Sequence, residues 1–217
     1  MNTQTTSTFK SGYEFLLAFK ITVPIYDYTV EFCNRCSPFH RHLPSSPSYP
    51  THFDSPAFPS SVTFPVLSSP RTHDQMVQAA RSGMTNIPEG YKQKSLSSYI
   101  KLSGVARGSI EELLHDFLSY AREHHIPVWD KERIRREIRE SREIWKILND
   151  TPTLPSNPIF PTLPKDPEIA VNLLIDLLKT AGFLQDRLIK SLEEKHRLEG
   201  GYKENLLKKR LAERNKK

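Results

Sequence analysis

The sequence has little of what secreted, membrane-spanning or disulfide-bonded proteins need. Its 217 residues include two cysteines, Cys33 and Cys36, which are one helical turn apart and do not form a disulfide framework. No stretch approaches the roughly 18 uncharged apolar residues of a membrane span. The opening MNTQTTSTFK lacks the charged and apolar regions of a signal peptide. We therefore expect a soluble, cytoplasmic protein that does not enter a membrane.

The sequence also lacks the motifs of common enzymes. It contains no glycine-rich phosphate loop, no nucleophile elbow and no HExxH motif. Ser109, Glu111 and Glu112 fall in the middle of one predicted helix, and their spacing does not bring a base to a nucleophile. We predict that the protein is not an enzyme, needs no cofactor and has no small-molecule substrate.

The hydrophobic fraction is low, and proline is concentrated in two segments. Only 37% of the residues are hydrophobic, below the roughly 45–50% of ordinary domains. Eight of the 17 prolines and nine serines lie in residues 37–70, and six more prolines lie between Pro152 and Pro167. Such a composition sustains neither helix nor central strand. The predicted organisation is a disordered N-terminus (1–12), a bundle-like region (13–149) interrupted by the insert 37–70, a proline-rich linker (150–166), and a long C-terminal helix with a basic tail (167–217).

Helical periodicity of apolar residues is the main local signal. Pro24 removes a backbone donor from the first predicted helix, which predicts a kink near Ile21. Thr72 and Gln75 have the spacing of a capping box at the start of the second helix. The predicted helices are 13–36, 72–90, 95–125, 130–148 and 167–199.

Caps and glycines mark the later helices. Asp130 is an N-cap for the highly charged helix 130–148. Asp166-Pro167-Glu168 supplies an N-cap, a proline at the first helical position and an early acid. Gly200 and Gly201 end that last helix. Gly104 and Gly108 weaken helix 95–125 and predict tight helix contacts there.

No segment combines strand alternation with turn residues, so the predicted fold class is all-α. Long amphipathic helices bury their apolar faces most simply against one another. We predict an antiparallel four-helix bundle with an additional charged helix, 130–148, and with the proline-rich insert and linker outside it. The bundle helices are 13–36, 72–90, 95–125 and 167–199.

Five short segments carry a family resemblance. They are IYDYTVEFC (25–33), QMVQAARS (75–82), NIPEG (86–90), ARGSIEEL (106–113) and LEGGY (198–202). They resemble the four-helix bundle family, some of whose members are encoded in intervening sequences of bacterial large-subunit ribosomal RNA genes. Relatives in that family act as accessory proteins of diversity-generating retroelements. The first segment, followed along the chain by RTHDQ (71–75), and the last segment resemble the subgroup that carries a four helix bundle suffix domain.

The resemblance implies an assembly as well as a fold. Characterised relatives form a barrel-like pentamer with a basic surface, and no enzymatic reaction is known for them. We therefore expect a homo-oligomer, with a pentamer as the implied form.

One group of side chains has the chemistry of a zinc site. Cys33, Cys36, His40 and His42 supply four possible ligands. However, there is no second knuckle, both histidines lie in the irregular insert, and zinc spacings usually enclose a longer loop. We favour a packed Cys33 and an incidental Cys36, and we predict no metal.

Charged and polar residues of the second and third helices predict a structural polar layer. Buried charges need partners, and such a layer fixes helix register. The predicted members are Arg81, Asn86, Glu89, Arg107 and Glu112.

Basic residues exceed acidic ones in two parts of the chain. The net charge is +6, with 14 basic against 11 acidic residues in 71–149 and 7 against 2 in 200–217. Positioned cations bind phosphates with little sequence preference. The interleaved glutamates of helix 130–148 offer the alternative of a solvated, internally paired face. The predicted nucleic-acid-binding residues are Lys92, Lys94, Lys101, Arg133, Arg135, Arg136, Arg139, Lys208, Lys209 and Arg210, with Arg142 beside them.

Two functions remain open at this point. One is a non-enzymatic oligomer associated with RNA or DNA, accessory to reverse transcription or ribosomal RNA metabolism. The alternative is a protein-interaction scaffold without a nucleic-acid role. A flanking reverse transcriptase gene or an interrupted ribosomal RNA gene would favour the first.

Overall fold

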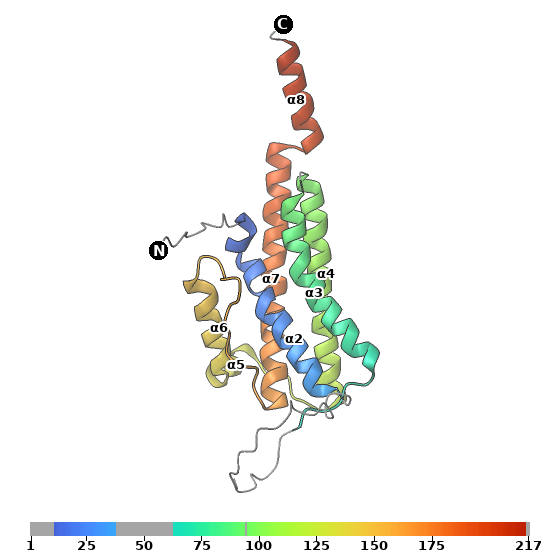
Figure 1. The fold of residues 1–217 in the computed structure, drawn as a ribbon, viewed down its shortest axis with the longest axis vertical. Helices are drawn as coiled ribbons and strands as arrows, with labels where there is room; N and C mark the ends of the chain where they lie inside the picture. The colour runs from blue at the N-terminus through green and yellow to red at the C-terminus, as the bar shows by residue number, and fades with distance from the viewer. Residues whose placement is uncertain (1–10, 38–62, 94, 216–217) are drawn as a thin grey trace, which may run out of the picture.

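The computed structural model describes residues 11–37, 63–93 and 95–215, and every regular element in this part of the chain is helical (Figure 1). The predicted all-α class is therefore confirmed. No helix within these ranges is long and apolar enough to cross a membrane. The elements are η1 (Gly12–Phe15), α1 (Leu17–Lys20), α2 (Thr22–Cys36), α3 (Pro70–Lys92), α4 (Leu96–Glu123), α5 (Lys131–Glu137), α6 (Arg139–Asp150), α7 (Pro167–Glu199) and α8 (Tyr202–Arg214).

Several helix boundaries follow from the local signals. The first predicted helix is interrupted at Ile21, and Pro24 lies in the first turn of α2, where a missing N–H costs little. At the start of α7, the Asp166 side chain accepts hydrogen bonds from the backbone N–H groups of Glu168 and Ile169. Gly200 ends α7 with a φ of 76°, which favours glycine. The predicted kink near Ile21, the N-cap at Asp166 and the end of the last long helix at Gly200 are confirmed.

The second predicted helix starts and ends at other residues than expected. Its N-cap is Ser69, whose Oγ accepts from the Thr72 N–H at 3.1 Å, so the Thr72 capping box was wrong. The helix also continues through Pro88 to Lys92. Ile87 is fully buried, and a Cβ on Gly90 would lie 2.5 Å from the Tyr99 ring of α4. This packing outweighs the roughly 3 kcal/mol cost of an interior proline.

The charged helix 130–148 is two helices, because the chain is extended at Ile138. The Ile138 side chain is fully buried, so burying it outweighs helix continuity. The prediction that Gly104 and Gly108 mark tight contacts was also wrong. Apart from its own helix backbone and adjacent residues, no described atom lies within 4 Å of a Cβ placed on either glycine, whereas a Cβ on Gly83 would meet Ile110 at 2.7 Å.

The long helices pack side by side, and their buried apolar side chains form a large core cluster and a smaller one around Ile87, Tyr99, Ala106 and Leu192. α3 lies along α4, α4 lies along α7, and α2 contacts both α3 and α7 (Figure 1). Phe32 of α2 is at the centre of an aromatic cluster, with ring centroids 5.5 Å from Phe64 and 5.0 Å from both Phe117 and Tyr120. Such edge-to-face pairs add to the free energy of apolar burial.

The proline-rich segments contribute to this packing. Tyr28 of α2 donates a hydrogen bond to the Pro161 carbonyl at 2.6 Å, and Arg35 donates to the Pro164 carbonyl at 2.7 Å. Phe64 and Leu67, at the end of the insert, are buried against the core. The rest of the insert, residues 38–62, and residues 1–10 lie outside the described ranges. Residues 161–164 of the irregular segment 151–166 therefore pack on α2.

The predicted polar layer does not form. Arg81, Glu89 and Glu112 are exposed, because their neighbours in the sequence, such as Ala80 and Leu113, occupy the inward positions. Asn86 donates to the Ser82 carbonyl of its own helix, and Arg107 pairs with Glu111 and Asp186. The buried polar side chains of α4, α6 and α7 are instead Ser103, Ser141, Asn172, Asp176 and Gln185.

Candidate nucleic-acid interface

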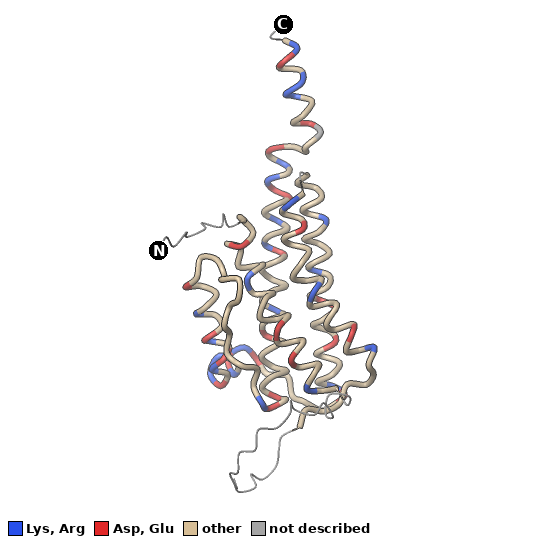
Figure 2. The backbone as a smooth tube through the Cα atoms, in the orientation of Figure 1, with Lys and Arg blue, Asp and Glu red and all other residues tan. Residues whose placement is uncertain are grey.

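The predicted cations lie in two separate regions. α8, which carries Lys208, Lys209 and Arg210, projects beyond the packed helices near the α3–α4 turn, whereas α5 and α6 lie beside the opposite half of α7 (Figures 1 and 2). Lys92 and Lys101 are exposed near that turn, and Lys94 lies outside the described residues. The structure therefore does not join the predicted residues into one surface.

Most of the predicted arginines of α5 and α6 are paired with glutamates. Arg133 and Arg136 both contact Glu137, at 3.2 Å and 3.1 Å, and Arg139 contacts Glu143 at 3.2 Å. Exposed pairs of this kind are worth up to about 1 kcal/mol. These three arginines therefore fit the alternative prediction, a solvated helix face whose arginines pair with its own glutamates.

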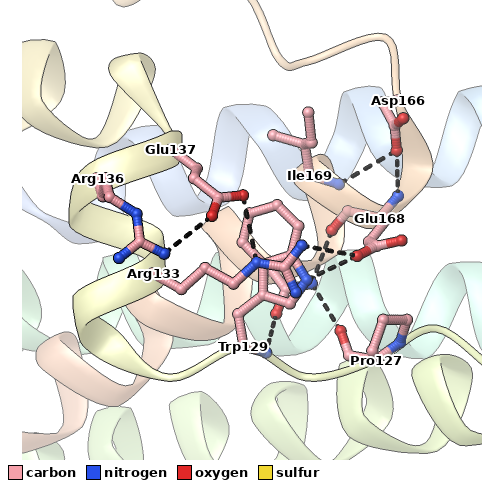
Figure 3. A network of polar contacts seen from close by, with 9 residues as sticks. Pro127, Trp129, Arg133, Arg136, Glu137, Asp166, Glu168 and Ile169 are labelled. Carbon is pink, nitrogen blue, oxygen red and sulfur yellow. Dashed lines mark hydrogen bonds and ion pairs between the residues drawn. The ribbon is translucent and has the colours of Figure 1, made fainter.

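Arg133 has a further structural role. Its guanidinium stacks 3.8 Å from the centroid of the Trp129 ring, and the Trp129 Nε1–H donates to Glu168 at 2.7 Å (Figure 3). The Trp129 backbone N–H donates to Asn172, whose side-chain amide donates to the Pro127 carbonyl. This network holds the start of α5 against the first turns of α7.

An outward stripe of α7 combines cations with an exposed aromatic ring. Lys179, Phe183, Arg187 and Lys190 are spaced by four, four and three residues, which places them on one helix face. Phe183 is 59% exposed, and the Arg187 guanidinium lies 5.8 Å from its ring centroid. Sequence reasoning missed this stripe because residues 150–199 are net acidic. The helical spacing of these four residues was the signal that could have found it.

Between α5 and this stripe lies a pocket of about 350 Å³. Lys131 and Lys179 are exposed at its rim. Neither these lysines nor Arg135 and Lys190 form an ion pair with any described residue within 4 Å. The pocket is lined by Trp129, Lys131, Ile134, Ile175, Asp176, Lys179, Thr180 and Phe183.

Asp176 is an acid buried in the wall of this cationic pocket. The residue is only 8% exposed. Burial raises the pKa of its carboxyl, while Lys131, Arg135, Lys179 and a hydrogen bond with Ser141 act in the opposite direction. The carboxylate has more acceptor positions than Ser141 occupies.

A second pocket, of about 330 Å³, lies between the α3–α4 turn and the α7–α8 junction. Tyr91, Tyr99, Tyr202 and Lys195 contribute to its lining. Lys195 is 3.9 Å from Glu199 of its own helix. The Tyr99 hydroxyl is buried and has no hydrogen-bond partner among the described residues, and burial raises the pKa of Tyr99 to about 12.

The two cysteines are core residues. Both are fully buried, and burial raises the pKa of the Cys36 thiol to about 11 and that of Cys33 as well. The Cys36 Sγ lies 3.5 Å from the Tyr120 hydroxyl. His40 and His42 lie outside the described residues, and within the described ranges no group of three or more His, Cys, Asp or Glu side chains could hold a metal ion.

Comparison with family models, with curated proteins and with solved structures found no match for this chain. Cations that form no ion pair within the described residues, beside an exposed aromatic ring, can bind phosphates and stack bases, which is the chemistry of single-stranded nucleic-acid binding.

Proposed function

We propose that the protein is a non-enzymatic helical oligomer that binds the backbone of RNA or DNA in an accessory role. The observation that carries this proposal is the surface between α5 and α7, called here the α5–α7 surface. It contains Lys131, Arg135, Lys179 and, further along the outward stripe of α7, Lys190, none of which forms an ion pair with another described residue. The 59% exposed ring of Phe183 lies among them. The cations of this surface suit phosphates, and its aromatic ring suits an unpaired base.

The proposed architecture is an antiparallel four-helix bundle of α2, α3, α4 and α7, extended by α5, α6 and α8. The contacts of α3 with α4, of α4 with α7, and of α2 with both α3 and α7 support it. The motif segments 75–90 and 106–113 support membership of the four-helix bundle family. Membership of that family implies an accessory role in reverse transcription or ribosomal RNA metabolism.

The test is the salt dependence of binding to a single-stranded oligonucleotide. Each phosphate contact contributes roughly 0.7–0.9 to the slope of log affinity against log salt. Replacing the four cations of the α5–α7 surface by glutamine should lower that slope by about three. The matched control replaces four exposed cations on other elements by glutamine, namely Arg71, Arg81, Lys146 and Lys165.

The control variant should retain most of the slope, because its cations lie outside the α5–α7 surface. If the slope falls equally in the two variants, the effect depends on net charge alone, and the α5–α7 surface is not the binding site. Absence of binding by the intact protein at about 50 mM salt would remove the nucleic-acid proposal.

One observation favours the scaffold alternative and self-association. The end of α7 and α8 expose four large apolar side chains, Leu198, Tyr202, Leu207 and Leu211, which are 69%, 50%, 58% and 49% exposed. Exposed apolar groups of this kind mark protein contacts. Light scattering should therefore report a mass several times 25.0 kDa. Leu207→Glu combined with Leu211→Glu should lower it, and a monomeric native protein would refute the oligomer.

A further inference from the structure

The α5–α7 pocket contains a charged group that backbone binding does not use. Asp176 is more than nine-tenths buried in the pocket wall, within a surface whose other charges are cations. A carboxylate repels phosphates, so its presence does not help to bind a nucleic-acid backbone. A carboxylate accepts hydrogen bonds, so we expect the ligand to present a hydrogen-bond donor to Asp176.

The pocket imposes three requirements on its ligand. The Asp176 carboxylate, which already has a hydrogen bond with Ser141, has further acceptor positions that suit N–H or O–H donors. The apolar wall of Trp129 and Ile175, with Phe183 at the mouth, requires a flat apolar group. Lys131 and Lys179 at the rim favour an anionic group and repel a simple cation. A nucleotide satisfies all three requirements, since its base supplies donors and a π-face and its phosphate supplies the charge.

Among the bases, guanine fits a carboxylate best. Its Watson–Crick edge presents two adjacent donors, N1–H and the 2-amino group, which match the two oxygens of one carboxylate. Adenine places an acceptor nitrogen beside its single donor group, and uracil flanks its N–H with two carbonyl oxygens. Both of those edges repel a carboxylate oxygen, and cytosine offers a single donor group.

The pocket has room for a base. Its volume of about 350 Å³ is within the roughly 300–1,000 Å³ range of small-molecule sites. One face of Trp129 is occupied by Arg133, so the base contacts the side of the ring that lines the pocket. Phe183, two helical turns along the same face of α7 from Asp176, remains open to stack on the base.

We infer that the α5–α7 pocket binds a guanine base, with Asp176 accepting from its Watson–Crick edge, Phe183 stacking on it, and Lys131 and Lys179 binding the adjoining phosphates. The inference deepens the proposed function and, for a guanine within a strand, rests on it. The same chemistry would hold a free guanine nucleotide, so the experiment separates these two sources.

The experiment compares short oligouridylate strands that differ at one central position. Guanosine there should bind about tenfold or more tightly than adenosine or uridine, because a good bidentate contact to a base discriminates at that level. Inosine, which keeps N1–H and lacks the 2-amino group, should fall between them. Guanosine monophosphate and adenosine monophosphate, titrated separately, report on free nucleotides.

Variants connect any preference to the pocket. Asp176→Asn replaces one carboxylate oxygen by a donor, so it should abolish the preference for guanosine and leave the salt slope unchanged. The matched control, Asp186→Asn, removes a carboxylate of the same helix that pairs with Arg107, and it should keep the preference. Phe183→Ala should weaken all strands alike, since stacking tolerates every base. Circular dichroism verifies that each variant is folded.

The outcomes distinguish the inference from the proposed function. Tight binding of all strands with no preference for guanosine overturns the inference and leaves backbone binding intact. Guanosine monophosphate binding that Asp176→Asn removes, without strand binding, supports the pocket and overturns the proposed function. A preference that survives Asp176→Asn refutes the role of Asp176, and no binding of any probe refutes both.

Discussion

The guanidinium of Arg133 stacks on the Trp129 indole at 3.8 Å from the ring centroid. Arg133 also pairs with Glu137 at 3.2 Å, and Trp129 is only 8% exposed. A residue that the sequence indicates as a phosphate ligand therefore positions α5 on α7. Lys131 and Lys179, at the rim of the α5–α7 pocket, form no ion pair with any described residue.

Arg133→Ala should destabilise the protein by about 1–2 kcal/mol, because it removes a cation–π contact and the ion pairs with Glu137 and Glu168. Urea unfolding followed by circular dichroism measures the change. Arg136→Ala is the matched control: its side chain is 70% exposed and pairs only with Glu137 among the described residues, so we expect a change within about 0.5 kcal/mol. Equal effects of the two substitutions would contradict the role assigned to Arg133.

Phe64→Ala should cost about 3 kcal/mol, although residue 64 lies in the proline-rich insert. Its ring is 6% exposed and 5.5 Å from that of Phe32, and truncating a buried phenylalanine removes apolar contact and leaves a cavity. Val66→Ala, at a side chain that is 39% exposed, should change the stability little. For the same reason, deletion of residues 40–68 should lower the melting temperature, whereas an unchanged value would show that Phe64 contributes no core contact.

Pro88→Ala should stabilise the protein by about 1–3 kcal/mol. Pro88 lies inside α3 without an N–H to donate, and alanine restores that donor and removes the clash of the ring with the preceding turn. Thermal unfolding measures the gain. A loss of stability would show that the proline ring contributes packing that alanine does not replace.

Asp176→Asn should stabilise the folded protein at neutral pH. Burial raises the pKa of this carboxyl above its ordinary value of 3.8, against the opposing effects of Lys131, Arg135, Lys179 and Ser141. The folded state then binds the proton more tightly than the unfolded state, so the ionised carboxylate is a net cost above the folded pKa. That cost disappears as the pH falls to the unfolded value.

The advantage of Asp176→Asn over the native protein should therefore be largest at neutral pH and vanish below about pH 3.8. Urea unfolding of both proteins across this range measures it. A native protein that is more stable than the variant at pH 7 would show that the neighbouring cations outweigh the desolvation of the carboxylate.

Short-range signals in the sequence determined the helical class and several helix ends. Asp130 and Asp166 cap their helices, Gly200 ends α7, and Pro24 lies in the first turn of α2. These features depend on hydrogen bonds and backbone angles within a few residues, and such interactions are readable from neighbours in the chain.

Tertiary packing decided the rest. Because Ile87 is buried, α3 continues past Pro88. Because Ile138 is buried in an extended conformation, the charged helix is divided into α5 and α6. The candidate pocket joins Lys131 of α5 to Asp176 of α7, whose proximity neither local sequence specifies. Which helix face turns inward, and which distant side chains then meet, depends on the apolar area that the whole assembly removes from water.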